Sequence, residues 1–386
     1  MSSPTETFQP EKPHAATPLS EAAYWLTLGG IVLLAIVLRV FAVEHQSIWY
    51  DEAFTIKIIE NDYSEILSGR VRDNGNPPLY WVLAKAWATV GGRTELGYRS
   101  LSVLLSVLTV PAVSSLGRKL LSAWAGLFAA FLLAISPFAI ELGNEARTFA
   151  LLQLLAVAST GAFVAWRSQP GVGKLLCYAA LIFLMGYSHY YAFAVPMAHG
   201  VSLLFGAEGR RKIAPFILAI GLAAAAYLVW LPVFVQQLTT PSNLSRYGDS
   251  WMTQFAATPL AMAFGRTFAW RDSSRALLAA GSLISLVAFV APAVGAIFAA
   301  RYESKTRALL AGWWLAPIVA PFAACLLGVP MYGVRYATIG LPGFLLLVAA
   351  GSERLSRPVR LLQLAMIIGG TSVSLYNYAQ FPLKDD

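Results

Sequence analysis

The stretch of sequence that decides the fold is residues 24–43, YWLTLGGIVLLAIVLRVFAV, in which Arg39 is the one charged residue. A helix of about 20 apolar residues matches the hydrocarbon core of a bilayer, which is about 30 Å thick. The stretch is too long for the core of a signal peptide, and no small-residue cleavage site follows it, so it predicts a retained membrane span. The polar, proline-containing residues 1–20 before it predict a disordered cytoplasmic tail.

The whole chain has the composition of a polytopic membrane protein. Of its 386 residues, 57% are hydrophobic and 12% are charged, and the mean hydropathy is +0.61. Soluble domains carry about 25% charged residues, so this composition excludes a soluble globular protein. The two cysteines, Cys177 and Cys325, lie in apolar runs, which excludes a disulfide scaffold. The net charge of +8 follows from the predicted topology, so we expect no nucleic-acid partner.

Apolar runs separated by short polar links predict eleven membrane spans. The spans are expected at residues 23–43, 98–117, 121–140, 148–166, 175–189, 192–206, 213–235, 276–300, 308–328, 336–350 and 360–377. Alternate links carry 13 basic residues against three acids, Glu208, Glu303 and Glu353. The positive-inside rule makes these links cytoplasmic and places the remaining links and the C-terminus outside. The predicted fold is an all-α membrane bundle that forms one domain over residues 21–386.

Two of the outer connections are long, residues 44–97 and residues 236–275. The first contains the apolar run PPLYWVLAKAWATV at residues 77–90, whose helical length of about 21 Å is too short to cross the membrane. Asn76 is suited to cap this helix, and Gly91-Gly92 are suited to end it. Because the run is rich in Tyr and Trp, we expect an interfacial helix.

A cluster of ionisable residues directly after the first span is the first candidate for chemistry. It comprises Glu44, His45, Asp51, Glu52, Lys57 and Glu60. Adjacent residues of a helix point about 100° apart, so Asp51 and Glu52 are expected to have different roles. A structural alternative stays open, in which Asp51 caps a helix over residues 52–67 and Glu52 complements its dipole.

Further charged and aromatic residues lie where other spans emerge on the same outer side. They are Arg99, Glu145 with Arg147, the turn His189-Tyr190-Tyr191, and Arg335 with Tyr336. A single arginine at the end of a span is ordinary snorkelling, but several that converge beneath an acidic loop predict a site for an anionic headgroup. His189 taken alone is more often a hydrogen-bonded structural residue than a catalyst. Arg39 is expected to pair with a carboxylate of the loop, with a phosphate contact as the open alternative.

Five motifs in order resemble the dolichyl-phosphate-mannose-protein mannosyltransferase-like glycosyltransferases, a branch of the GT-C superfamily. They are Trp49-Tyr50-Asp51-Glu52-Ala53, Asn76-Pro77-Pro78-Leu79-Tyr80-Trp81, Ser136-Pro137 with Asn144-Glu145-Ala146-Arg147-Thr148-Phe149, Ser188-His189-Tyr190, and Val334-Arg335-Tyr336. The resemblance covers about residues 24–350 and is to a minimal form of the family. Asn76 replaces a frequent His, and Thr148 stands where Pro is common, so an imidazole is not available at position 76.

The resemblance implies a GT-C bundle and an inverting glycosyltransferase. Such an enzyme moves a sugar from a polyprenyl-phosphate carrier to an acceptor hydroxyl at the extracytoplasmic face. It implies that Asp51 is the general base, and that Glu52 binds the sugar or orients a partner such as Arg147. The substrate-binding residues that it implies are Glu52, Asn76, Glu145, Arg147, His189, Tyr190, Arg335 and Tyr336. The expected location is the plasma membrane, of the bacterial inner-membrane type, with the site facing the periplasm.

The identity of the acceptor and the use of a metal stay open at this point. The acceptor is a glycan, a lipid or a protein, and a divalent cation is an open cofactor, because no acidic triplet has the spacing of metal ligands. A lipid-linked polysaccharide ligase or polymerase is the nearer alternative, but the paired Asp51-Glu52 favours the transferase. A transporter or flippase is less favoured, because the charges lie at one surface and no two halves match.

Overall fold

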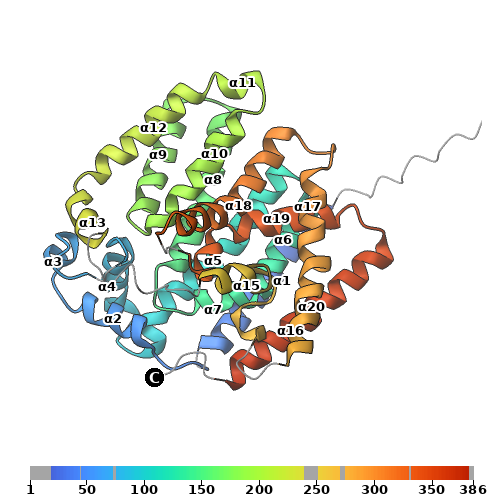
Figure 1. The fold of residues 1–386 in the computed structure, drawn as a ribbon, viewed down its shortest axis with the longest axis horizontal. Helices are drawn as coiled ribbons and strands as arrows, with labels where there is room; N and C mark the ends of the chain where they lie inside the picture. Colours follow the sequence, from blue (N-terminus) through green and yellow to red (C-terminus); the bar gives the residue numbers. More distant parts are fainter. Residues whose placement is uncertain are drawn as a thin grey trace, which may run out of the picture.

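The computed structural model describes residues 19–43, 45–72, 75–238, 251–269, 274–329 and 332–381, and in these residues it contains helices and no strand (Figure 1). This architecture confirms the predicted all-α bundle. The tail predicted over residues 1–20 lies outside the described residues except for its last two positions. Part of the second outer connection, residues 239–250 and 270–273, also lies outside them.

Six helical segments of the described chain are long and apolar enough to cross a membrane. They are α1 (Glu21–Val43), α5 (Glu95–Leu120), α8 (Phe149–Ser168), α18 (Ser304–Leu326), α20 (Arg357–Gln380) and Arg275–Ile297, which consists of α16 (Arg275–Ser285), the π-helical turn η4 (Leu286–Val290) and α17 (Ala291–Ile297). Two bent pairs raise the number to eight if each pair is one span: α6 (Ala123–Ile135) with α7 (Pro137–Gly143), and α12 (Ile213–Tyr227) with α13 (Leu231–Leu238). The chain is therefore a multi-pass membrane protein.

Every predicted span coincides with one of these segments or with a shorter helix, but the number eleven is not confirmed. The shorter helices are α9 (Val172–Gly186), α10 (Ala194–Leu203) and α19 (Leu341–Ser352), of 15, 10 and 12 residues. At 1.5 Å per residue, α19 is about 18 Å long, which is too short for a straight span. All its residues are buried, because it packs against α6, α17 and α18. Its apolar sequence therefore reflects a place in the protein core.

Links that were predicted to share one side of the membrane do lie together. The Glu353 carboxylate accepts hydrogen bonds from Ser122 Oγ at 3.0 Å and from Tyr302 OH at 2.8 Å, which joins three separate basic links. At the other end of the bundle, Gln46 Nε2 donates to the carbonyl oxygen of Tyr378 at 2.7 Å. The start of the first outer connection and the end of α20 therefore share a face, as the predicted topology requires.

The first outer connection folds into three short helices, α2 (Tyr50–Ile59), α3 (Tyr63–Leu67) and α4 (Leu79–Gly91). The single helix predicted over residues 52–67 is wrong, because the chain breaks after Ile59 and restarts with Asp62 at the N-cap position of α3. Lys85 Nζ of α4 donates to the carbonyl oxygen of Ile59 at 3.1 Å and lies 5.2 Å from the centre of the Tyr63 ring. These contacts hold the three helices together.

The interfacial helix predicted at residues 77–90 corresponds to α4, but its start differs. The helix begins at Leu79, with Pro78 at the N-cap position, so the prediction that Asn76 caps it is wrong. The Leu79 N–H, which has no partner inside the helix, donates to the carbonyl oxygen of Tyr187 at 2.9 Å instead. Gly92 ends the helix with a φ of +82°, a conformation that glycine adopts without strain.

The break between α6 and α7 explains the one charge in the first span. Leu133 O has no helical donor, because the residue four positions on is Pro137, which lacks an N–H. Arg39, which is fully buried, donates to the carbonyl oxygens of Leu133 at 3.3 Å and Ala134 at 3.0 Å, and its Nε donates to Ser106 Oγ at 2.8 Å. The prediction that Arg39 pairs with a loop carboxylate is therefore wrong, since the arginine satisfies the end of a broken helix.

Candidate active site

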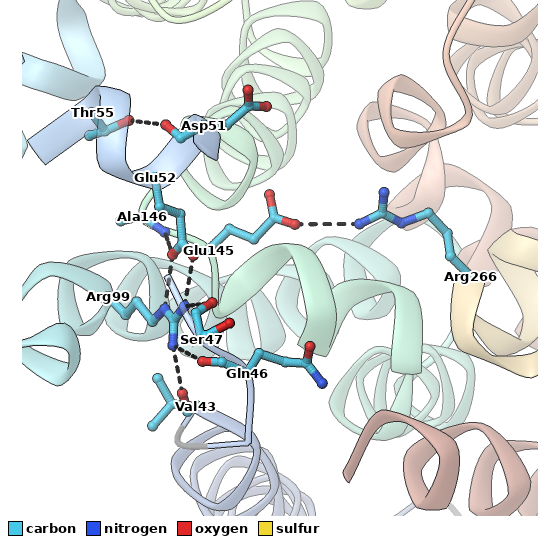
Figure 2. Close-up of polar contacts among 10 residues, drawn as sticks. All are labelled: Val43, Gln46, Ser47, Asp51, Glu52, Thr55, Arg99, Glu145, Ala146 and Arg266. Atoms are coloured by element: carbon cyan, nitrogen blue, oxygen red, sulfur yellow. Dashed lines mark hydrogen bonds and ion pairs between the residues drawn. The ribbon is translucent and has the colours of Figure 1, made fainter. Parts of the chain in front are cut away.

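Glu52 and Arg99 form the centre of a polar network at the end of the bundle where the connection after α1 folds (Figure 2). Arg99 donates from Nε to Glu52 Oε1 at 2.9 Å and from Nη2 to Glu52 Oε2 at 2.7 Å, and both side chains are almost completely buried. The Ala146 N–H also donates to Glu52 Oε1, at 2.8 Å. Glu52 thereby ties α2 to α5 and to the connection between α7 and α8.

Arg99 has further acceptors in the segment that follows the first span. It donates to the carbonyl oxygens of Val43 at 3.0 Å, Gln46 at 2.7 Å and Ser47 at 2.8 Å (Figure 2). A buried ion pair is stable when its remaining donors are satisfied, and these carbonyl groups meet that condition. The pairing with Arg99 favours a positioning role for Glu52 over contact with a sugar.

Asp51 lies in the first turn of α2, where its carboxylate faces two arginines. Its Oδ2 is 3.2 Å from Arg335 Nη1 and 3.8 Å from Arg147 Nη2, and Arg147 Nη1 donates to the Asp51 carbonyl oxygen at 3.2 Å. Trp49 occupies the N-cap position, so the alternative in which Asp51 caps the helix is wrong. The Asp51 side chain keeps 19% of its surface exposed, so its carboxylate is accessible to a ligand.

The two arginines come from parts of the chain that are far apart in the sequence. Arg147 lies in the connection before α8, and Arg335 lies in the 3₁₀ turn η5 (Val334–Ile339). The Arg335 guanidinium lies over the rings of Trp49, at 5.0 Å, and Phe149, at 5.8 Å. Cation–π contacts of this kind hold the planar group in one orientation. Two guanidinium groups beside one carboxylate leave an excess of positive charge that suits an anion.

A second acid cluster was missed by the sequence analysis. Glu141 of α7 and Glu145 are both buried, and Arg266 of the turn η3 (Arg266–Ala269) pairs with both. Figure 2 shows its contact with Glu145, where Arg266 Nη2 lies 3.4 Å from Oε1. Glu145 was predicted as a site residue, but neither Glu141 nor Arg266 was. Glu141 could have been found, because it is a carboxylate directly after a long apolar run. Arg266 could not, because it lies in a long connection and belongs to no motif.

The predicted residues His189 and Tyr336 lie in one aromatic cluster next to Arg335. Their ring centres are 5.0 Å apart, and Tyr191 stacks on Tyr336 at 4.2 Å. His189 is buried, and its Nδ1 accepts from the Tyr191 N–H at 3.1 Å, at the start of the turn η1 (Tyr190–Phe193). Thr148 Oγ1 contacts Ser188 Oγ at 2.7 Å, which joins this turn to the Arg147 segment.

Two predicted residues lie in other surroundings. Tyr190 OH contacts the side chain of Gln237 and accepts from Trp230 Nε1 at 3.1 Å, so it joins the α12–α13 region. Asn76 precedes α4 and does not begin it. The structure thus brings Asp51, Arg147 and Arg335 into direct contact and places Glu52, His189 and Tyr336 beside the segments that carry them. In the described part of the chain, no three His, Cys, Asp or Glu side chains gather in a way that holds a metal ion.

Comparison with known proteins places this geometry in a family context. Residues 75–235 match the family model of dolichyl-phosphate-mannose-protein mannosyltransferases. No curated protein matches the sequence. Among solved structures, the chain is similar to ArnT from Cupriavidus metallidurans bound to undecaprenyl phosphate, with a TM-score of 0.62 and 16% sequence identity. The superposed region covers 89% of this chain and 63% of the ArnT chain. It is also similar to the Archaeoglobus fulgidus oligosaccharyltransferase tethered with an acceptor peptide, with a TM-score of 0.60 and 14% sequence identity. Here the superposed region covers 93% of this chain and 55% of the oligosaccharyltransferase chain.

The chain thus spans less than two thirds of the length of these two structures. Because the sequence identity to both structures is low, the similarity shows a shared fold and no more. Residues 24–350 carry the family motifs, and residues 75–235 carry the match to the family model. The resemblance predicted from the motifs is therefore confirmed: this chain has the GT-C membrane fold and resembles the dolichyl-phosphate-mannose-protein mannosyltransferases.

Proposed function

We propose that this protein is an inverting glycosyltransferase that moves a sugar from a polyprenyl-phosphate carrier to an acceptor hydroxyl at the extracytoplasmic face of the membrane. The observation that carries this proposal is the contact of the Asp51 carboxylate with Arg335, at 3.2 Å, and Arg147, at 3.8 Å. A base and two fixed cations are the two kinds of group that such a transfer needs. The similar ArnT structure is bound to undecaprenyl phosphate, which supports the carrier class.

In the proposed reaction, an Asp51 oxygen accepts the proton of the acceptor hydroxyl. The hydroxyl oxygen forms a bond to the anomeric carbon on one face of the sugar, while the bond to the phosphate oxygen breaks on the other face. The carrier phosphate leaves with the electron pair, and its new negative charge is stabilised by Arg147 and Arg335. General-base catalysis of this kind contributes about 10²–10⁴-fold, and preorganised cations add stabilisation where the charge develops.

The contacts of Asp51 with Arg147 and Arg335 also link donor binding to the state of the base. The carrier phosphate competes with Asp51 for the two guanidinium groups, because both anions prefer the same planar donors. Binding of the carrier therefore frees the Asp51 oxygens for the acceptor hydroxyl. This order couples the arrival of the donor to the availability of the base.

The remaining residues have positioning and binding roles in this proposal. The buried Glu52–Arg99 pair fixes α2 against the connection that carries Arg147. We assign Asn76, Glu145, His189, Tyr190 and Tyr336 to the walls that contact the sugar or the acceptor. We assign no site to a divalent cation in this proposal. Two buried acids, Glu141 and Glu145, are already paired with the same cation, Arg266.

Lipid extracts of a deletion strain test this function and identify the sugar in the same experiment. Mass spectrometry is expected to find a polyprenyl-phosphate sugar that accumulates in the deletion strain and disappears when the wild-type gene is restored. Asp51→Asn should fail to clear it, whereas Asp62→Asn, the same change at an exposed residue of the same connection, should clear it. Clearance by Asp51→Asn, or the absence of any accumulating polyprenyl-phosphate sugar, contradicts the proposal.

A further inference from the structure

A cavity of about 680 Å³ lies at the end of the bundle opposite the candidate active site. It is bordered by the last turns of α5 and α8, by the link that contains α11 (Ala207–Arg210), and by residues 301–306. Figure 1 shows α11 and α2 at opposite ends of the molecule. Along α8 alone, Arg167 is separated from Phe149 by about 27 Å. The cavity is therefore independent of the proposed chemistry at Asp51.

The walls of this cavity carry an excess of positive charge. Five cationic residues line it: Lys119, Arg167, Lys212, Arg301 and Lys305. Two acids, Glu208 and Glu303, also line it, but their side chains are 76% and 68% exposed. Glu208 pairs with Lys212, whose side chain is only 12% exposed, and Glu303 pairs with Lys305 at the rim. Arg301 pairs with Glu353 at 3.4 Å. The five cations exceed these three acids, so the cavity keeps a net positive charge.

Arg167 is the residue that separates this cavity from an ordinary basic surface. It lies in the last turn of α8, it is only 8% exposed, and its Nη1 has no hydrogen-bond partner among the described residues. Its guanidinium lies 5.4 Å from the centre of the Phe163 ring, and Lys212 Nζ donates to its carbonyl oxygen at 2.6 Å. Buried donors are normally paired, so a buried guanidinium nitrogen without an acceptor points to a ligand that supplies one.

The positive-inside rule accounts for cations at this end of the bundle but not for the burial of one. Arg210 and Arg211, in the neighbouring link that contains α11, are exposed to solvent, as the rule leads one to expect. Arg167 instead faces a cavity, where removal of its charge from water is costly without a counter-ion. The exposed basic residues are sufficient to orient the chain in the membrane, so the buried charge of Arg167 is not explained by topology.

We propose that this cavity binds a phosphate group, carried either by an anionic lipid headgroup or by a free phosphate ion. Arginine donates two parallel hydrogen bonds to phosphate oxygens, and the nearby lysines add point charge. Leu120, Leu121 and the half-exposed Phe205 provide an apolar border, which suits the glycerol and acyl part of a lipid. The predicted topology places this site at the cytoplasmic face.

Thermal unfolding of the purified full-length protein tests the proposal with two probes. The protein is measured with inorganic phosphate, and with dioleoyl-phosphatidylglycerol against dioleoyl-phosphatidylcholine in the same detergent micelles. A ligand that binds the folded state raises the unfolding temperature by mass action. A rise with inorganic phosphate identifies free phosphate as sufficient, and a rise with phosphatidylglycerol alone identifies a lipid headgroup.

Arg167→Gln is the deciding variant, and Arg211→Gln, at an exposed position of the neighbouring link that contains α11, is its matched control. Arg167→Gln should weaken binding of the effective probe at least about tenfold, as expected for loss of a charge-assisted hydrogen bond. Its ligand-free unfolding temperature should change little, because Nη1 has no hydrogen-bond partner to lose and only the contact with the Phe163 ring is removed. Lys305→Gln at the rim is a second variant and should weaken binding less.

Three results overturn the proposal. The first is the absence of a rise with either probe. The second is equal binding by Arg167→Gln and Arg211→Gln, which assigns any rise to surface charge or to the arginines at the opposite end. The third is a drop in the ligand-free unfolding temperature of Arg167→Gln with unchanged probe affinity, which assigns Arg167 to a structural role.

Discussion

Glu52 and Arg99 are 47 residues apart in the sequence, and in the folded protein they form a buried, two-point ion pair with contacts of 2.7 and 2.9 Å. Glu52 also accepts from the Ala146 N–H, one residue before Arg147. The pair therefore sets the distance between α2, which carries Asp51, and the segment that carries one of the two arginines facing Asp51. The two adjacent acids of the motif therefore differ: Glu52 is buried and holds α2 in place, whereas the Asp51 carboxylate is accessible.

The first prediction concerns this anchor. Glu52→Gln removes one member of a buried ion pair and leaves Arg99 without its counter-charge, a change that costs about 3–5 kcal/mol. We expect a strong loss of folded protein, measured by thermal unfolding in detergent. Glu60→Gln, at an exposed position of the same connection, is the control and should be nearly neutral. A Glu52→Gln protein as stable as wild type would show that the pair does not hold the site together.

The second prediction concerns the base. Asp51→Asn is nearly isosteric and should lower turnover at least about 10²-fold, because the amide does not accept the acceptor proton. The thermal unfolding temperature should stay close to that of wild type, and the binding of undecaprenyl phosphate should be retained or become stronger, because the neutral amide competes less with the phosphate for Arg147 and Arg335. Turnover is measured with the donor isolated from the deletion strain. Near-normal turnover in Asp51→Asn together with its loss in a folded Glu52→Gln protein would reverse the roles of the two acids.

The third prediction concerns the carrier phosphate. Arg335→Lys keeps the positive charge but loses both the planar fork and the fixed orientation over Trp49 and Phe149. We expect the affinity for undecaprenyl phosphate to fall about tenfold, which corresponds to about 1.4 kcal/mol. Arg211→Lys, on an exposed part of the chain, is the control. Unchanged affinity in Arg335→Ala and Arg147→Ala removes both residues from the phosphate site.

The fourth prediction concerns the cluster that the motifs do not include. Arg266→Gln removes the cation that pairs with Glu141 and Glu145, both of which are buried, and should destabilise the protein by about 3 kcal/mol or more. The double variant Arg266→Gln with Glu141→Gln should recover part of that loss, because one of the two carboxylates is then neutral. Thermal unfolding measures both changes. Equal stability of the single and double variants indicates that Glu141 and Arg266 are not coupled.

The fifth prediction concerns topology. In a protein with Cys177 and Cys325 replaced by Ser, a cysteine at position 72 should react with an impermeant thiol reagent added outside. A cysteine at position 210 should react after the membrane is permeabilised. The reason is the excess of basic residues on the links that include Arg210. Labelling of position 72 from the cytoplasmic side reverses the predicted orientation, and the proposed extracytoplasmic site with it.

The sequence by itself determined the class of fold and pointed to the residues that meet at the candidate site. Hydropathy over about 20 residues is a local property, so the spans at α1, α5, α8, α18 and α20 were predictable from the chain alone. The motifs likewise pointed to Asp51, Arg147 and Arg335 before their contacts were known. The number of spans was less predictable, because a run such as α19 is apolar for burial in protein and not for contact with lipid.

Only the tertiary structure decided which charges are partners. Asp51 and Arg335 are 284 residues apart, and their contact depends on how η5 packs against α8 and on where the end of the first span leads the chain. Arg39 was expected to pair with a carboxylate, but the missing N–H of Pro137 gave it a carbonyl acceptor on another helix. Side-chain pairing is decided by three-dimensional packing, whereas hydrophobic periodicity and motifs record only neighbours along the chain. For this reason the motifs did not predict that Glu141 and Arg266 pair with each other beside Glu145.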